Sequence, residues 1–155
     1  MPESVFQRIE SWLNGQSIEF RVLRHAPVFT SAEAAAIRGV ALASGAKALI
    51  CKADGQFVFF VVPADRKLAS KPVRSRRGWK SFRFADRDEV LALTGLAPGA
   101  IPPFGSLFGL QTLCDERLGE QPVINFNAGD HAISISMNFE DYLRAERPEL
   151  GQFAE

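Results

Sequence analysis

Apolar and polar residues follow two different periods along the chain, and each period predicts one kind of element. In residues 3–14 the apolar positions recur at helical spacing, which predicts an amphipathic first helix. Residues 18–23 alternate apolar and charged side chains instead, the pattern of a half-buried strand. Thr30 and Glu33 then form the signature of a capping box, which predicts an alanine-rich helix that ends at Gly39.

The clearest element signal is a hairpin in the first half of the chain. Two apolar runs, 46–52 and 56–62, flank the dipeptide Asp54-Gly55, which favours the positive φ angles of a two-residue hairpin turn. The second run is apolar on both faces. We therefore expect it to be a central strand in a sheet that is covered on both sides.

Shorter elements follow in the second half. Strands are predicted over residues 81–84, 107–113, 123–126 and 132–137, helices over 86–93 and 138–145, and a turn over 127–130. Strands outnumber helices and connect mainly through hairpins. The sequence predicts one α+β domain spanning residues 1–155, in which helices pack outside a curved, barrel-like, mixed and largely antiparallel sheet.

Composition adds limits but selects no partner. The chain has 155 residues, 46% of them apolar, and 18 basic residues balance 18 acidic ones. Cys51 and Cys114 lie far apart, which fits buried thiols in a reducing compartment better than a disulfide framework. No apolar run approaches the roughly 20 residues of a membrane span, and the N-terminus lacks a basic leader. We expect a soluble, cytoplasmic protein with no membrane partner.

Residues 94–105 form the most unusual stretch, because they contain three glycines and three prolines. Proline fixes φ, whereas glycine permits positive φ and close approach of another atom, so the stretch is predicted to be a rigid loop with exposed amides. Such a loop either joins two elements or forms the rim of a binding site.

Lys47 is the unusual charge, since it opens a strand that is otherwise mostly apolar. Its ammonium group either extends past the sheet end into water or faces a cavity where it meets an anion. Together with the rigid loop it would form a pocket with one fixed cation and several backbone N–H donors. Such a pocket suits a small polar ligand or a developing oxyanion.

Positive charge is concentrated in residues 65–80, where seven lysines and arginines face one aspartate. The segment is either a solvated helix and loop or a site for nucleic-acid phosphates. The second interpretation would use Arg74, Arg76, Arg77 and Lys80. No helix-turn-helix or zinc-finger pattern accompanies the segment, so DNA is not an expected partner.

The common catalytic motifs are missing from the sequence. There is no G-x-S-x-G elbow, no H-E-x-x-H and no Walker loop, and the only histidines are His25 and His131. A metal site is not expected. Thr30 and Ser31 open a helix, whose N–H groups are either simply capped or available to an anion.

Four segments, in order, resemble the YbaK-like family, also called the prolyl-tRNA-editing domain family. They are His25-x-Pro27-Val28-x-Thr30-x-x-Glu33-Ala34, Gly45-Ala46-Lys47-Ala48-Leu49, Gly95-x-x-Pro98-Gly99-x-x-Pro102-Pro103-Phe104-Gly105, and Gly129-x-His131. The resemblance covers nearly the whole chain. It implies a free-standing enzyme that hydrolyses the ester of mischarged tRNA without a metal or cofactor, with help from the terminal ribose 2′-hydroxyl.

The resemblance also implies roles for individual residues. Lys47 is expected to be catalytic, and the expected substrate-binding residues are His25, Thr30, Gly99, Ile101, Pro102, Phe104, Gly105 and His131. The implied partners are the acceptor end of tRNA-Pro, or of a related tRNA carrying a small wrong amino acid, and prolyl-tRNA synthetase. Editors of alanyl-prolyl-tRNA often have asparagine where this chain has Ala48, so the amino acid stays open. A non-catalytic module that binds a tRNA end, a synthetase or a small ligand remains the alternative.

Overall fold

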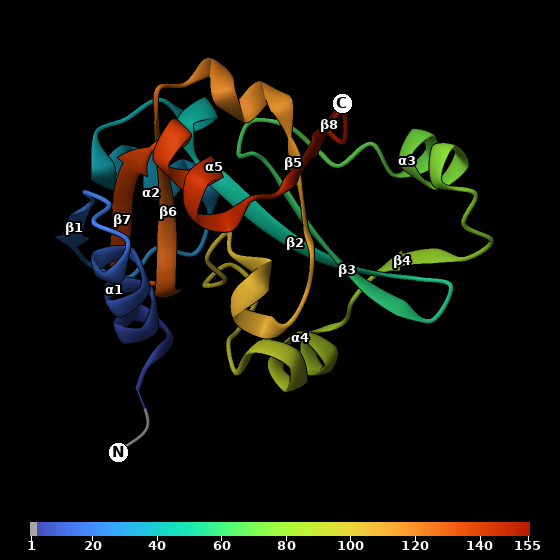
Figure 1. Cartoon of the computed structure of the whole chain (residues 1–155), viewed down its shortest axis with the longest axis horizontal. Helices are drawn as coiled ribbons and strands as arrows, with labels where there is room; N and C mark the ends of the chain where they lie inside the picture. Colours follow the sequence, from blue (N-terminus) through green and yellow to red (C-terminus); the bar gives the residue numbers. More distant parts are fainter. Residues whose placement is uncertain (1–2) are drawn as a thin grey trace.

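Two β-sheets organise residues 3–155, which the computed structural model describes (Figure 1). One sheet has three antiparallel strands in the order β1-β7-β6. The other has five strands in the order β4-β2-β3-β5-β8, with β3, β5 and β8 parallel to one another. The strands are β1 (Arg21–Arg24), β2 (Ala46–Ala53), β3 (Gln56–Pro63), β4 (Phe82–Phe84), β5 (Thr112–Asp115), β6 (Val123–Asp130), β7 (Ile133–Asn138) and β8 (Glu149–Gly151).

The predicted hairpin is the backbone of the larger sheet. β2 and β3 pair without interruption from Ala46 opposite Pro63 to Ala53 opposite Gln56. The φ angles of Asp54 and Gly55 are 48° and 81°, so both turn residues are left-handed, as a two-residue type I′ turn requires. β3 lies between β2 and β5, which confirms the prediction of a central strand.

The two sheets meet beside the start of β2. Gly45 forms an isolated parallel bridge with Asn125 of β6, and a Cβ atom on Gly45 would lie only 2.8 Å from the Cβ of Ala64. Only glycine allows this close approach. The expected mixed α+β fold is confirmed, but in place of the single curved sheet that was expected there are two sheets, which meet at this bridge.

Helices cover the outer faces of the sheets, with α1 against β6 and α5 against β7 (Figure 1). The helices are α1 (Val5–Gly15), α2 (Ser31–Arg38), α3 (Ser70–Arg77), α4 (Arg87–Thr94) and α5 (Phe139–Glu146), with short 3-10 helices η1 (Leu42–Ser44), η2 (Gly105–Phe108) and η3 (Glu116–Glu120). Within residues 3–155, none of the helices has the length and apolar character of a membrane span.

Three sequence-based expectations need correction. The strand expected over residues 18–23 is Arg21–Arg24, and all four residues are exposed because β1 is an edge strand that pairs only with β7. The strand expected over residues 107–113 begins at Thr112, because a 3-10 helix and the left-handed Gly109 precede it. The turn expected over residues 127–130 belongs to β6, which continues through a bulge.

A buried carboxylate attaches the end of the chain to the larger sheet. Asp115, at the end of β5, has no solvent exposure. Its Oδ2 accepts hydrogen bonds from the backbone N–H groups of Phe153 at 2.8 Å and Ala154 at 2.7 Å. Its Oδ1 accepts a third from the N–H of Arg117 at 2.9 Å. One side chain thus satisfies three backbone donors.

Replacing Asp115 by alanine should lower the free energy of unfolding by roughly 2–4 kcal/mol, because each buried N–H left without an acceptor costs about 1–3 kcal/mol. Urea unfolding followed by circular dichroism measures this change. The control Asp141→Ala removes a surface ion pair with Arg144 and should cost less than about 1 kcal/mol. Equal unfolding midpoints for the two variants would contradict the role given to Asp115.

Candidate active site

A cavity of about 350 Å³ lies where β2, β6, α2 and the loop 95–104 converge. Its lining is largely apolar, from α2, the first half of β2, β6 and α4. The polar side chains in the lining are those of Thr30, Ser31, Arg38, Lys47, Asn125 and Asn127. Two of these side chains are cations and none is an acid, so the cavity is electropositive although the whole chain has no net charge.

Lys47 lies in the cavity wall, at the second position of β2. Its side chain is partly buried, and Nζ donates a hydrogen bond to the carbonyl oxygen of Arg66 at 2.9 Å. Burial lowers the pKa of the ammonium group, an effect that nearby Asp65 opposes and Lys67 reinforces. The ammonium is therefore fixed against the backbone just after β3, and Arg66 itself is not among the cavity-lining residues.

The glycine-proline loop contributes Pro98, Gly99 and Ile101 to the cavity wall. Gly99 has a φ of 90°, which favours glycine, and its carbonyl oxygen accepts a hydrogen bond from Asn127 Nδ2 at 2.7 Å. Within the described residues, the N–H groups of Gly99 and Ile101 have no hydrogen-bond acceptor. The structure thus brings Lys47, Gly99 and Ile101 to one cavity, as the sequence predicts.

Pro102, Phe104 and Gly105 were expected to contact substrate, but they are absent from the cavity lining. Phe104 is fully buried in the core, and its ring lies edge-on to that of Trp12, with the ring centroids 5.2 Å apart. A Cβ atom on Gly105 would lie 2.6 Å from the hydroxyl oxygen of Thr112. These three residues are buried and hold the loop in place. The residues of the loop that line the cavity are Pro98, Gly99 and Ile101.

The two histidines lie beside the cavity and are not among its lining residues. His25 Nδ1 donates to the carbonyl of Ala26 at 2.8 Å, and Nε2 lies 2.7 Å from the hydroxyl oxygen of Ser134. His131 Nδ1 donates to the carbonyl of Val28 at 3.0 Å, because a carbonyl can only accept.

His131 borders the cavity through two residues that line it. Its Cε1 would lie 3.5 Å from a Cβ atom on Gly99, and its ring centroid is 4.7 Å from that of Phe29. Thr30 lines the cavity directly, but its hydroxyl oxygen also accepts from the N–H of Glu33 at 3.1 Å and so caps α2. The Glu33 carboxylate does not bond back to Thr30 and accepts from Phe29, so the expected reciprocal box is absent.

Three polar residues of the cavity, Arg38, Asn125 and Asn127, were missed by sequence reasoning. Arg38 donates from Nε to Ser134 Oγ at 2.8 Å and from Nη2 to Asn127 Oδ1 at 2.9 Å. Burial lowers the pKa of this guanidinium group to about 10. In the sequence, Arg38 resembles an ordinary cation in the last turn of a helix. Its partners lie about 90 positions away, so no local pattern reveals the contact.

Exposed aromatic side chains form a second missed feature. Of the thirteen phenylalanines, only Phe29 and Phe84 are exposed within the described chain, with relative exposures of 70% and 52%. Both line the cavity. An exposed phenylalanine loses the benefit of burial, so two of them at one opening indicate a contact surface.

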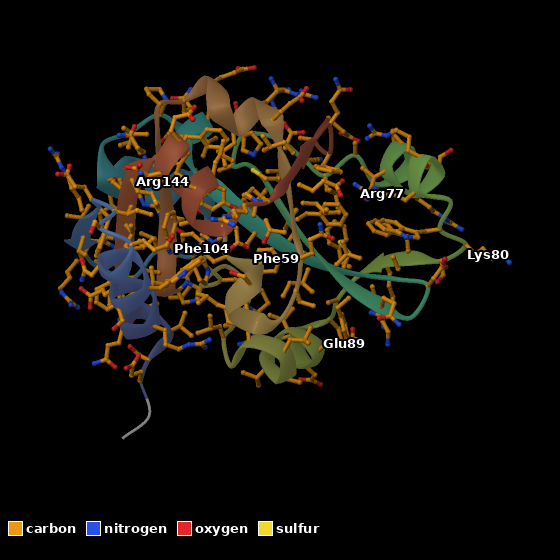
Figure 2. All side chains as sticks on the ribbon, in the orientation of Figure 1. Phe59, Arg77, Lys80, Glu89, Phe104 and Arg144 are labelled. Atoms are coloured by element: carbon orange, nitrogen blue, oxygen red, sulfur yellow. The ribbon has the colours of Figure 1, made fainter. Side chains whose placement is uncertain are left out.

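The basic side chains of residues 65–80 are not part of this cavity. Arg74 donates to the carbonyls of Trp79 and Lys80, Arg76 donates to the carbonyl of Gln152, and Arg77 pairs with Glu149. Figure 1 shows α3 and the three-stranded sheet at opposite ends of the molecule, and Figure 2 shows Lys80 at the outer edge. Arg74, Arg76, Arg77 and Lys80 are therefore not part of the cavity, although the start of the segment is in contact with Lys47 through the Arg66 carbonyl.

Comparisons with known proteins agree with this geometry. The model of the aminoacyl-tRNA editing domain matches residues 25–145. The Multifunctional Ser/Thr-tRNA deacylase ProXp-y of Escherichia coli (strain K12) is 38% identical over 152 residues, which cover 95% of this chain and 91% of that protein. A proline–tRNA ligase of Trichlorobacter lovleyi is 36% identical over 87 residues, 56% of this chain but 15% of the ligase.

A solved structure supports the fold independently. It is named as a candidate trans-editing enzyme for prolyl tRNA synthetase and superposes with a TM-score of 0.84 at 21% identity, over 100% of this chain and 99% of that one. The resemblance in the sequence is thereby confirmed, and the chain belongs to the aminoacyl-tRNA editing domain family.

Proposed function

We propose that this chain is a free-standing deacylase that hydrolyses the ester of mischarged tRNA in the cytoplasm. The observation that carries the proposal is the cavity of about 350 Å³, whose lining includes Lys47 and the loop residues Gly99 and Ile101. An aminoacyl ester is already activated toward water. A site that holds the ester and stabilises the oxyanion can therefore supply the catalysis.

The proposed reaction needs no protein nucleophile. Water attacks the ester carbon, negative charge develops on the carbonyl oxygen, and the Lys47 ammonium and the free N–H groups of Gly99 and Ile101 stabilise that charge. The bond to the ribose oxygen then breaks, and this oxygen receives the proton that the water loses. Cys51 and Cys114 are buried away from the cavity, and burial raises the pKa of both thiols to about 12.

The proposed substrate is a small wrong amino acid on tRNA-Pro or a related tRNA. The relative from Escherichia coli is named as a Ser/Thr-tRNA deacylase, and the lining of this cavity is polar as well as apolar, with Thr30 and Ser31 among its hydroxyl groups. Similarity to part of a proline–tRNA ligase supports prolyl-tRNA synthetase as a partner. Phe29 and Phe84 at the cavity suit stacking of unpaired bases at the tRNA end.

Lys47→Ala should lower the single-turnover rate at saturating enzyme by about 10²–10³, because one preorganised contact to a developing oxyanion is lost. Affinity for the tRNA should fall only slightly, since the contact strengthens in the transition state. Lys47→Arg should also be impaired, because the planar guanidinium cannot occupy the compact position of an ammonium. Rapid-quench assays with a mischarged tRNA measure the rate, and filter binding measures the affinity.

The opposite result would favour the non-catalytic binding module. In that case both Lys47 variants would keep the wild-type saturated rate, and only the affinity would change. Circular dichroism of each variant serves as the folding control.

His131→Ala should reduce kcat/KM by up to about tenfold, the effect of one lost neutral hydrogen bond. Its ring contacts Phe29 and bonds to the Val28 carbonyl, so we propose that it orients this side of the cavity. A rate identical to wild type would make His131 an ordinary turn residue. A loss as large as that of Lys47→Ala would assign it a part in the chemistry.

We also propose that Arg74, Arg76, Arg77 and Lys80 contact phosphates of the tRNA acceptor end, a proposal that rests on the concentration of charge. Each phosphate contact contributes roughly −0.7 to −0.9 to the slope of log K against log salt. The double variant Arg74→Gln/Lys80→Gln should therefore flatten the slope by between about one and two units. Arg144→Gln, on the distant α5, is the matched control (Figure 2). Equal slopes for both proteins would assign the segment to ordinary surface.

A further inference from the structure

Arg38 carries a charge that the protein itself does not neutralise. Its partners within hydrogen-bond distance are Ser134 and Asn127, both uncharged. No ion pair within 4 Å involves Arg38 among residues 3–155. A partly buried guanidinium without a carboxylate is costly, so binding of an anion there is favourable.

The same guanidinium still has donors available. Nε and Nη2 are engaged, but Nη1 has no hydrogen-bond partner in the described part of the chain. No described side-chain nitrogen or oxygen is both sealed from solvent and unpaired. Nη1 is therefore reachable, and because Arg38 lines the cavity, a ligand in the cavity can approach it.

The two engaged donors hold the guanidinium plane in place. Ser134 Oγ accepts from Arg38 and lies 2.7 Å from His25 Nε2, to which it can donate its own proton. Asn127 accepts from Arg38 through Oδ1 and donates through Nδ2 to the Gly99 carbonyl. The donors of Arg38 are thus oriented before any ligand arrives.

The chemistry of an aminoacyl-tRNA end indicates which anion fits. The ester and the amino acid supply no negative charge, and the nearest one is the phosphodiester before the terminal nucleoside. Arginine binds phosphate through a planar fork of donors. We propose, building on the deacylase function above, that Arg38 binds this phosphodiester while Lys47 acts on the ester.

A purely structural role for Arg38 is the competing explanation. The bonds to Ser134 and Asn127 also attach α2 to β7 and β6. Those bonds need neither a full charge nor an open Nη1. The two explanations differ in whether the effect of a substitution depends on a phosphate in the substrate.

The test compares two seryl esters, one of adenosine and one of the dinucleotide cytidylyl-(3′→5′)-adenosine, which adds a single phosphodiester. The wild type should show a kcat/KM about 10- to 100-fold higher for the dinucleotide ester, the value of a charge-assisted contact. A dinucleotide ester with an uncharged methylphosphonate linkage measures how much the added nucleoside alone raises kcat/KM. Arg38→Gln should reduce the ratio to near that value. Arg38→Lys should be intermediate, because it keeps the charge and loses the fork.

The comparison variant is Ser134→Ala, which removes the partner of Nε but leaves the charge and Nη1. Its ratio should fall less than that of Arg38→Gln, because Asn127 still orients the guanidinium group. If Arg38→Gln lowered the rates for both esters equally, or if Ser134→Ala abolished the preference as fully, the phosphate subsite would be refuted.

Affinities for the corresponding seryl-amide analogues, measured by calorimetry, decide the same question without turnover. A wild type that hydrolyses no ester would contradict the deacylase function. A loss of preference for the phosphate-bearing amide in Arg38→Gln would still support the subsite, and an unchanged preference would refute it.

Discussion

The hydrogen bond from Lys47 Nζ to the Arg66 carbonyl is the contact on which the proposed site depends, because it fixes the otherwise flexible side chain of a cavity-lining residue. The residue that carries this carbonyl is itself bonded to the C-terminal segment. Arg66 Nη1 donates to the carbonyl of Glu155 at 2.9 Å, and Glu155 donates its N–H to Lys67 at 2.8 Å. Buried Asp115 holds the two residues before Glu155. The C-terminal segment therefore supports the backbone that holds Lys47, a residue of the candidate active site.

The net charge of the chain does not show how charge is distributed within the fold. The chain is neutral overall, yet its cavity has two cations, Lys47 and Arg38, and no acid in its lining. They lie on different elements and have different neighbours, a backbone carbonyl for one and neutral side chains for the other. In the proposed function the two cations serve different parts of the substrate, Lys47 the ester and Arg38 the phosphodiester.

Sequence patterns predicted the elements that depend on residues close together in the sequence. Asp54-Gly55 sets the hairpin because the turn needs two left-handed residues, and Lys47 is conspicuous because it begins an apolar strand. The composition of the glycine-proline loop predicts that the loop is rigid, but it does not predict which of its residues line the cavity. Phe104 was therefore expected in the cavity, whereas it is buried in the core. Arg38 was missed because its hydrogen-bond partners lie 96 and 89 residues away, and only the assembled fold brings them together.

The central claim is that the chain by itself turns over a mischarged tRNA. The most direct measurement is single-turnover deacylation by the purified chain over a panel of tRNAs that carry correct and incorrect amino acids. The account predicts rapid release of at least one small wrong amino acid, such as serine or alanine, while correctly charged prolyl-tRNA stays intact. Saturable binding of these tRNAs with no hydrolysis above the buffer rate would contradict it and identify a binding module.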